Sequence, residues 1–317
     1  MPFDPSIPST LKVLSDHYAK KQPHQVDILT EETPILSRIK FEQASHGLWN
    51  AYEEIADIKG AGMVDMNAVL PVVGVATELK KIDLNIFGGV IECPEDTAKM
   101  YGGHSKYFAK RMPSILRKSG MDSERGILYK NLLAYALANK GLALTAGGTA
   151  NSTGKTGLFT ILALRQVPGE TIGLYSPEGF KQGAMFDVTP VNGGSLHYLT
   201  TGIHQGVLGY ALRLKAYFGF QIANPRTVGA IVNIKAASLP TPAQIDDLLA
   251  NVRATPASTV LLMHPRLLGM LNAYKADKLE VQTTTKDMDR RFTHWNGIEI
   301  LTSYNFEDGD EKQATVI

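Results

Sequence analysis

A glycine-rich loop is the segment of this chain whose residue types come nearest to a phosphate-binding site. It reads Gly147-Gly-Thr-Ala-Asn-Ser-Thr-Gly-Lys-Thr. A P-loop has the spacing G-x-x-x-x-G-K-[ST], follows a strand and opens a helix, so that backbone N–H groups converge on one anion. Here the first glycine would have to be residue 149, which is Thr149, and Gly148 is one position early. A helix is predicted before the loop and a strand after it. The sequence favours a polar loop, with a P-loop nucleotide hydrolase as an alternative that Lys155→Ala would test.

The histidines and the single cysteine do not form a metal-binding pattern. The nearest histidine pairs are His17 with His24 and His197 with His204. Neither pair has Cys, Asp or Glu at the spacing of metal ligands, so exposed or hydrogen-bonded histidines are predicted. Cys93 has no second cysteine with which to form a disulfide or a CxxC zinc site. It is expected to be a buried packing residue, with a reactive thiol as the alternative.

Two acidic runs could bind cations. They are Glu53-Glu54 and the run Glu307-Asp-Gly-Asp-Glu. The second run is too short for an EF-hand calcium loop, so both are expected to lie on a solvated face. No G-x-S-x-G nucleophile motif occurs. We therefore predict no catalytic, cofactor-binding or metal-binding residue, no cofactor, and no enzymatic activity.

The composition predicts a folded protein. The chain has 317 residues, of which 44% are hydrophobic and 20% charged, which is ordinary for a globular protein with a large core. Its formal net charge of +1 does not suggest a protein whose main task is to bind nucleic acid. The first residues lack the features of a signal peptide, and no apolar stretch is long enough to span a bilayer. The protein is expected to be made and kept in a cytosol.

The N-terminal residues 1–45 are predicted to form an arm. They carry five prolines and one window with helical periodicity, Thr10 to Lys20. The apolar residues of that window are Leu11, Leu14 and Tyr18. Because the arm has no core of its own, it must bury these side chains against something else.

Residues 48–92 are predicted to form a long two-stranded excursion. Apolar Ile82, Leu84 and Ile86 alternate with polar residues, which is the pattern of a half-buried strand. The middle of the segment contains Gly60, Gly62 and Gly74. A single hairpin cannot bury both of its faces and is marginally stable alone. The segment therefore needs a neighbouring molecule.

Residues 94–140 are the main helical block. Pro113 should kink or restart the first helix, because proline lacks the backbone N–H and clashes with the preceding turn. Gly120 should end that helix, and Asp122 or Ser123 should cap the next one. The apolar stripe of the second helix consists of Leu128, Leu132 and Tyr135.

The rest of the chain alternates strands and turns, so the fold class is α+β. Strands are predicted at 157–164, 170–175, 210–217, 227–234, 259–263 and 297–302. The first two are expected to pair across the turn Val167-Pro-Gly. A helix fits residues 241–253, with Thr241 and Gln244 as a capping box, and another begins at Pro265.

Several segments share their order with one protein family. They are Ile28-Leu-Thr-Glu-Glu-Thr-Pro-Ile-Leu, Trp49 to Gly62, Asn131 to Gly148, Tyr175-Ser-Pro-Glu-Gly, Gly209-Tyr-Ala-Leu-Arg-Leu-Lys, Phe218-Gly-Phe-Gln-Ile-Ala-Asn-Pro-Arg and Trp295-Asn-Gly-Ile-Glu-Ile-Leu. In this order they resemble the major capsid proteins of tailed bacteriophages, of the Hong Kong 97 type and its short-tailed-phage branch. The resemblance covers roughly residues 28–304. The broken spine helix expected at Pro113 and Gly120 departs from many relatives.

The resemblance implies a Hong Kong 97-type capsid fold. Its parts would be an N-terminal arm (1–45), an E-loop (46–92), a peripheral domain with the spine helix (93–145), linking strands (146–235) and an axial domain (236–317). In this family the arm and the E-loop lie across neighbouring subunits. This would explain two segments that cannot bury their own apolar faces.

The resemblance also implies a structural function. The chain would assemble with itself into the hexamers and pentamers of an icosahedral shell around double-stranded phage DNA, without sequence-specific binding. Expected partners are a scaffolding protein, a portal and, as an optional partner, a decoration protein, with no membrane. The protein would be assembled in the host bacterial cytoplasm and found in the virion capsid, in a shell without covalent crosslinks. An encapsulin-like nanocompartment shell, which shares this fold, is the alternative.

Overall fold

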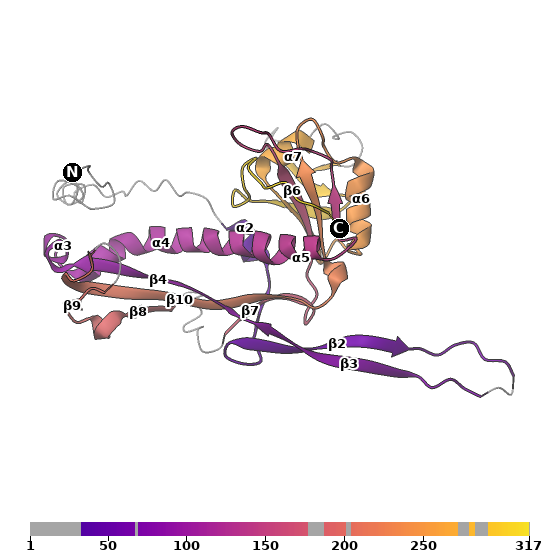
Figure 1. Ribbon diagram of the computed structural model, residues 1–317, viewed down its shortest axis with the longest axis horizontal. Coiled ribbons are helices and arrows are strands. Elements are labelled where there is room, and N and C mark those ends of the chain that lie inside the picture. The colour runs from indigo at the N-terminus through magenta and orange to yellow at the C-terminus, as the bar shows by residue number, and fades with distance from the viewer. Residues whose placement is uncertain are drawn as a thin grey trace. The chain divides into compact units, whose positions relative to one another are not determined.

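The computed structural model describes residues 33–66, 69–176, 187–200, 204–271, 279–282 and 291–316 (Figure 1). The predicted helix at 10–20 and most of the predicted arm lie outside these residues. The chain divides into two compact units. The described residues within 86–123 and 179–217 belong to unit 1, and those within 34–85, 124–178 and 218–317 belong to unit 2. No helix among the described residues is long and apolar enough to cross a membrane.

The largest sheet of unit 2 has seven strands. In spatial order they are β13 (Leu279–Gln282), β14 (Arg291–Trp295), β15 (Ile298–Thr302), β12 (Thr259–Met263), β6 (Phe159–Arg165), β11 (Val228–Ile234) and β5 (Ala143–Thr145). The helices of this unit are α2 (Pro34–Arg38), a π-helical segment (Ile127–Leu133), α5 (Ala134–Ala138), α6 (Pro242–Asn251) and α7 (Pro265–Leu271). The central strand β6 is buried along its length except at its last residue, which is typical of a strand covered on both faces.

Helices cover both faces of this sheet. On one face α6 and α7 pack Leu248 and Leu267 into the cluster that contains Ile161 of β6. Alternate side chains of a strand point to the opposite face of the sheet. On that opposite face, β11 contacts α5 and the π-helical segment. A Cβ atom at Gly229 of β11 would lie 2.7 Å from the side chain of Leu248. Glycine at this position therefore lets α6 approach the sheet closely.

Most of the elements predicted for this unit are confirmed. Strands β6, β11, β12 and β15 occur where periodicity placed them. The capping box of α6 is present, with Thr241 Oγ1 accepting from Gln244 N at 3.2 Å and Thr241 N donating to Gln244 Oε1 at 2.9 Å. Helix α7 begins at Pro265, as predicted.

The predicted pairing of β6 with β7 (Thr171–Tyr175) is wrong. Strand β7 instead pairs in parallel with β1 (Phe41–Gln43) and antiparallel with residues 218–222 of β10 (Leu208–Ile222). Strand β6 already has β12 and β11 as its two neighbours. Because both edges of β6 are taken, the turn after it leads into a different sheet rather than into a hairpin.

Unit 1 contains a second group of elements. They are β4 (Asn85–Pro94) from its second residue on, α3 (Glu95–Met100), α4 (His104–Gly126) as far as Ser123, β8 (Asp187–Pro190), a turn of 3-10 helix (Val191–Gly194), β9 (His197–Tyr198) and the first ten residues of β10. Helix α3 begins after Pro94 and has two acidic residues in its first turn. Strand β10 pairs with β4, β8 and β9, and Cys93, Ala98 and Phe108 form the local core.

The predicted break in the spine helix is wrong. Helix α4 runs without interruption through Pro113 and Gly120 and continues into the π-helical segment and α5 (Figure 1). Ala109 and Pro113 both lie on the exposed side of α4, so water can reach the carbonyl that proline leaves without its helical partner. Asp122 and Ser123 do not cap a new helix. Asp122 pairs with Lys118 at 2.7 Å, and the Ser123 hydroxyl donates to a carbonyl one turn earlier.

Candidate assembly surface

The predicted two-stranded excursion is present as a hairpin in unit 2. Strands β2 (Trp49–Lys59) and β3 (Gly74–Asp83) pair antiparallel, with Trp49 opposite Asp83 and Lys59 opposite Gly74. Among the described strands, neither pairs with any other. The alternating segment expected from Ile82 to Ile86 is divided between two strands, because β3 ends at Asp83 and β4 begins two residues later.

The described residues of the hairpin tip (60–66 and 69–77) expose a series of apolar side chains. Those exposed are Met63, Val64, Met66, Val69, Leu70, Val72, Val73 and Val75. The exposed fraction reaches 107% for Met63 and 93% for Met66. Asp65 is the one charged residue of the tip. Because burying an apolar side chain of this size contributes about 1.5–3 kcal/mol, the tip has a large free-energy gain available from contact with another surface.

The base of the hairpin is fixed by specific contacts, in contrast to the tip. The Trp49 ring stacks on His46 at 3.6 Å, and Lys81 Nζ lies 5.4 Å from the centre of the same ring. Asn50 Nδ2 donates to Gln221 Oε1 of β10 at 2.6 Å. Leu84, which follows β3, is buried in a small cluster with β7 residues. The hairpin is therefore anchored at its base, whereas the described residues of its tip expose their apolar side chains.

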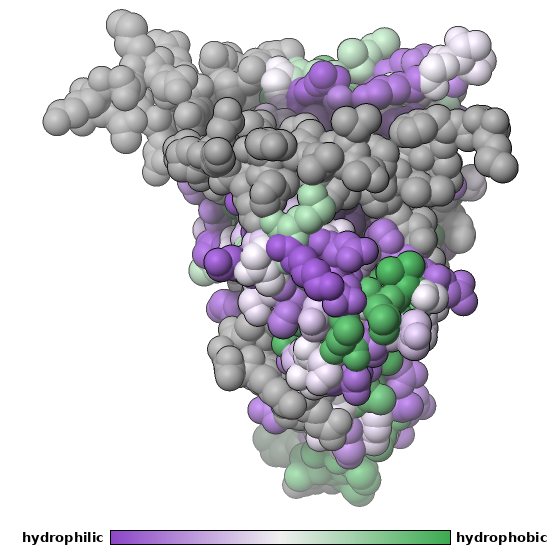
Figure 2. Space-filling view, turned by 90° about the vertical axis from the view of Figure 1, so that its left-hand side faces the viewer, coloured by the Kyte–Doolittle hydropathy of each residue, from purple (hydrophilic) through white to green (hydrophobic). Residues whose placement is uncertain are grey.

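A second apolar patch lies in unit 1, at the paired strands β9 and β10. Its exposed members are Leu196, Tyr198, Val207 and Leu208. Tyr198 and Leu208 are register partners, so part of the patch is a cross-strand pair on a rigid ladder. Figure 2 shows a face on which hydrophobic side chains, in green, gather among hydrophilic ones, in purple. Exposed apolar patches rimmed by polar residues are typical of protein–protein contact surfaces.

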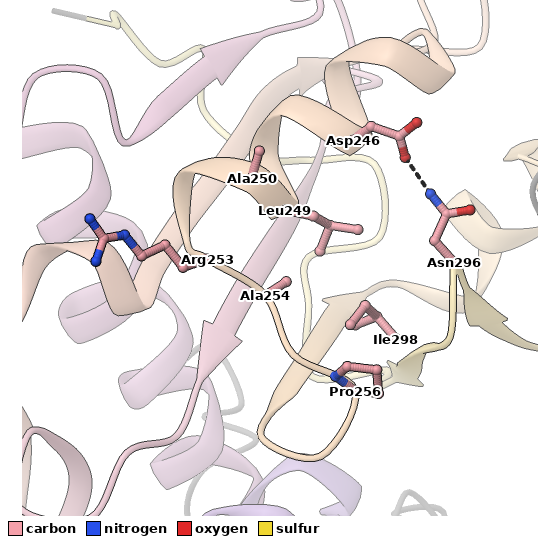
Figure 3. Close-up of a pocket in the computed structure, with 8 residues that line it drawn as sticks. All are labelled: Asp246, Leu249, Ala250, Arg253, Ala254, Pro256, Asn296 and Ile298. Atoms are coloured by element: carbon pink, nitrogen blue, oxygen red, sulfur yellow. Dashed lines mark hydrogen bonds between the residues drawn. The ribbon is translucent and has the colours of Figure 1, made fainter.

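Unit 2 also has an open groove of about 320 Å³ beside the end of α6 (Figure 3). At one end Asp246 Oδ1 accepts hydrogen bonds from Trp295 Nε1 at 2.9 Å and from Asn296 Nδ2 at 2.7 Å. Arg253 lies at the other end. Between them the lining is apolar, made by Leu249, Ala250, Ala254, Pro256 and Ile298. The lining contains no serine, cysteine or histidine, so the groove does not present a nucleophile with a base.

The glycine-rich loop does not have the geometry of a P-loop. Strand β6 follows it, where a P-loop would open a helix. Lys155 Nζ lies 3.0 Å from the carbonyl oxygen of Asp308 and 3.2 Å from its Oδ2. A Cβ at Gly148 would lie 2.5 Å from the carbonyl oxygen of Asn233. The lysine is thus engaged by a carboxylate, and the loop packs against β11 rather than enclosing an anion.

The expectation that residues 307–311 lie on a solvated face is wrong. Glu311 is buried, with 4% of its surface exposed. Asp308 pairs with Lys155 and, at 2.9 Å, with Arg266, and Glu307 pairs with Arg125. The acidic run therefore forms ion pairs that hold the C-terminal segment against the rest of unit 2. Only the overall acidity of this segment was visible in the sequence, because its partners lie far away along the chain.

Glu311 has two hydroxyl donors in this buried position. Its carboxylate accepts a hydrogen bond from Thr160 Oγ1 and another, at 2.7 Å, from the hydroxyl of Tyr129. Burial raises the pKa of Glu311 to about 7, although both hydrogen bonds favour the charged form. Burial and the nearby charge of Glu311 also raise the pKa of Tyr129, so its hydroxyl stays a donor.

This raised pKa predicts how stability depends on pH. A group whose folded pKa, about 7, exceeds its ordinary value of 4.5 binds its proton more tightly in the folded state. Its contribution to the free energy of unfolding, about 3 kcal/mol, is complete below pH 4.5. This contribution is lost as the pH rises to about 7. Denaturant unfolding at pH 5 and pH 8 should therefore show a smaller loss of stability for Glu311→Gln than for the unmodified chain. Asp310→Asn, at an exposed neighbour, should behave like the unmodified chain, and equal losses in all three would contradict this assignment.

The histidines singled out in the sequence do not form a metal site within the described residues. His197 is half-buried, and its Nδ1 lies 2.9 Å from the Ser195 carbonyl oxygen. His17 and His24 lie outside the described residues. Within the described part of the chain, no group of three His, Cys, Asp or Glu residues could hold a metal ion.

Cys93 is fully buried, and burial raises the pKa of its thiol to about 12. The thiolate is the reactive form of cysteine, so this residue should be inert in the folded protein. We expect Ellman's reagent at pH 8 to modify the thiol only after denaturant is added. Rapid labelling of the native protein would show that the thiol is accessible and that the buried-core assignment is wrong.

We compared the sequence and the structure of this chain with those of known proteins. No family model and no curated protein matches the sequence. A chain in the structure of bacteriophage Epsilon15 is 13% identical, with a TM-score of 0.60 over 100% of this chain and 98% of that one. The bacteriophage JBD30 capsid is 11% identical, with a TM-score of 0.54 over 96% and 99%. A chain of the JBD30 capsid decorated with minor capsid protein trimers is 12% identical, with a TM-score of 0.54 over 94% and 99%.

These similarities extend over nearly the whole of each chain, so they concern the complete fold rather than one shared motif. At this level of identity they establish the architecture alone. The chain therefore has the Hong Kong 97-type fold of bacteriophage capsid proteins.

Proposed function

We propose that this chain is a major capsid protein of a tailed bacteriophage, a structural subunit that assembles into an icosahedral shell. The observation that carries the proposal is the hairpin with an anchored base and an exposed apolar tip. A subunit that worked alone would lose solubility from such a tip without gaining anything. In a shell, the same tip would lie on an identical copy.

The second apolar patch supports assembly through several contacts. Together with the hairpin tip, it gives the subunit at least two apolar surfaces on different elements. A closed symmetric assembly repeats each contact in every subunit, so interfaces of modest size suffice. Hexamers and pentamers of this chain are the arrangement that we propose.

Further partners belong to the same proposal. We propose a scaffolding protein and a portal, and a decoration protein as an optional partner. The similarity to a JBD30 capsid decorated with minor capsid protein trimers supports the last of these. The shell would enclose double-stranded DNA, be assembled in the host cytoplasm and end in the virion. It would have no catalytic role, cofactor or covalent crosslinks.

We propose that each segment of the chain forms one part of the capsid fold. Residues 1–45 would be the arm, 46–92 the E-loop, 93–145 the peripheral domain, 146–235 the linking strands and 236–317 the axial domain. The hairpin β2–β3 lies within the proposed E-loop, and α4 lies within the proposed peripheral domain. Both correspondences support the division.

Electron microscopy of the purified full-length chain, with and without a co-expressed scaffolding protein, tests the proposal. We expect closed particles of uniform diameter. A sample that stays monomeric in both conditions would contradict the proposed function. Particles that enclose a cargo enzyme in place of DNA in the native host would instead identify an encapsulin-like compartment.

A further inference from the structure

Two methionines of the hairpin tip have side chains that are open to solvent. Met63 is 107% exposed and Met66 is 93% exposed. Only Val64 and Asp65 separate them in the chain. The other methionines of the described residues are buried or half-buried: Met100, Met112, Met121, Met263 and Met270. Within the described part of the chain, the thioether sulfurs open to solvent are therefore gathered in one short segment.

The surroundings of this segment leave both sulfurs accessible. Every residue from 60 to 66 is exposed. A Cβ atom at Gly60 or Gly62 would have no heavy atom within 4 Å apart from its chain neighbours. Because oxidation of a sulfur-containing side chain depends on access for the oxidant, Met63 and Met66 should react before the buried Met263.

The single cysteine does not compete for an oxidant. The Cys93 thiol is fully buried, and burial raises its pKa to about 12. The reactive thiolate is therefore scarce in the folded protein. A thioether has no proton to lose before it reacts, so only access limits its oxidation. The sensitivity of the described chain to peroxides therefore lies at the hairpin tip.

We propose that Met63 and Met66 are a site of reversible modification by peroxides, and that their oxidation to methionine sulfoxide keeps an unassembled subunit out of the shell. The second half of this inference rests on the proposed function. In the reaction, a sulfur lone pair attacks one oxygen of hydrogen peroxide, the O–O bond breaks and an S–O bond forms. The sulfur is oxidised, and the peroxide is reduced to a molecule of water that keeps both of its protons.

The sulfoxide removes the property on which the proposed contact depends. A thioether is apolar and flexible, so it can fill an irregular gap in an apolar interface. A sulfoxide oxygen is a hydrogen-bond acceptor, and burying it without a donor is unfavourable. Two such groups in one tip should lower the association constant of each contact by about tenfold or more.

The modification would act on free subunits alone. Once the tip lies on a neighbouring copy, the two sulfurs are covered and the oxidant loses access to them. Methionine sulfoxide reductases convert the sulfoxide back to the thioether. An oxidised subunit would therefore be held back from assembly until it is reduced.

The first measurement is a time course of peptide mapping by mass spectrometry on the full-length unassembled subunit in hydrogen peroxide. The sulfoxides of Met63 and Met66 should appear before those of Met121 and Met263, which are buried. Equal rates at the four positions, or slower reaction at the tip, would overturn the assignment of the site.

The second measurement is particle formation, by sedimentation and electron microscopy, after the peroxide has been removed. Oxidised subunits should form about tenfold fewer particles, and methionine sulfoxide reductases A and B together should restore the yield. The variant Met63→Leu/Met66→Leu keeps apolar side chains of similar volume and should assemble equally well before and after peroxide. The matched control Met112→Leu/Met270→Leu keeps the tip methionines and should lose assembly as the unmodified chain does.

Normal particles from subunits in which both tip methionines are oxidised would overturn the inference. A leucine variant that assembles before peroxide and fails after it would also overturn it, because the damage would then lie elsewhere. If the leucine variant does not assemble at all, recovery of the unmodified chain by the reductases, with the Met63 and Met66 sulfoxides followed in the peptide map, decides the matter. Absence of particles from the untreated, unmodified chain counts against the proposed function, whereas the peptide map still decides the site of oxidation.

Discussion

Replacing Met63, Met66 and Leu70 by serine will abolish shell formation and leave the subunit folded. All three side chains lie exposed at the hairpin tip, so their removal takes nothing from the core of the subunit. In the shell each would contribute about 1.5–3 kcal/mol of burial. Every subunit repeats the contact. A loss of several kcal/mol of association free energy at each interface is therefore repeated over the whole particle.

Particle yield by sedimentation and electron microscopy, together with thermal unfolding of the subunit, measures this effect. The control variant Asp65→Asn/Thr77→Ser/Glu78→Gln changes exposed polar residues of the same hairpin and should still assemble. Normal particles from the serine variant would show that the tip is not an interface. A lowered unfolding temperature would show that the tip supports its own subunit.

Glu124→Ala will lower the free energy of unfolding by about 3–5 kcal/mol. The Glu124 side chain is fully buried. Its Oε1 accepts from Ser303 Oγ at 2.5 Å and from Asn305 Nδ2 at 2.8 Å, and its Oε2 accepts from Leu36 N at 2.9 Å. Alanine would leave two buried donors and one half-buried donor without this acceptor.

Denaturant unfolding of the purified subunit measures the loss. Asp122→Asn, two residues earlier in α4, removes an exposed ion pair with Lys118 and should cost less than about 1 kcal/mol. A Glu124 variant as stable as this control would mean that water or another group replaces the carboxylate, and the assigned network would be wrong.

Local patterns predicted much of this fold. The glycines and alternating residues of 48–92 predicted the hairpin, and Thr241 with Gln244 predicted the start of α6. These features depend on neighbours within a few residues. Strands β1, β5 and β9 were not predicted, because two or three residues are too few to show a period.

Other features depend on contacts that no local pattern reveals. Pro113 was expected to break α4, and the helix continues because that residue faces solvent. The buried roles of Glu124 and Glu311 depend on partners 179 and 151 residues away, at Ser303 and Thr160. A lone acidic residue in a sequence looks the same whether it ends on the surface or in such a network.

A cryo-electron microscopy map of assembled particles would show whether the apolar hairpin tip becomes stable by lying on an identical copy. We expect closed particles in which Met63, Met66 and Leu70 are buried against a neighbouring subunit. A map in which these side chains fold back onto their own subunit, or stay exposed in a closed particle, would contradict it.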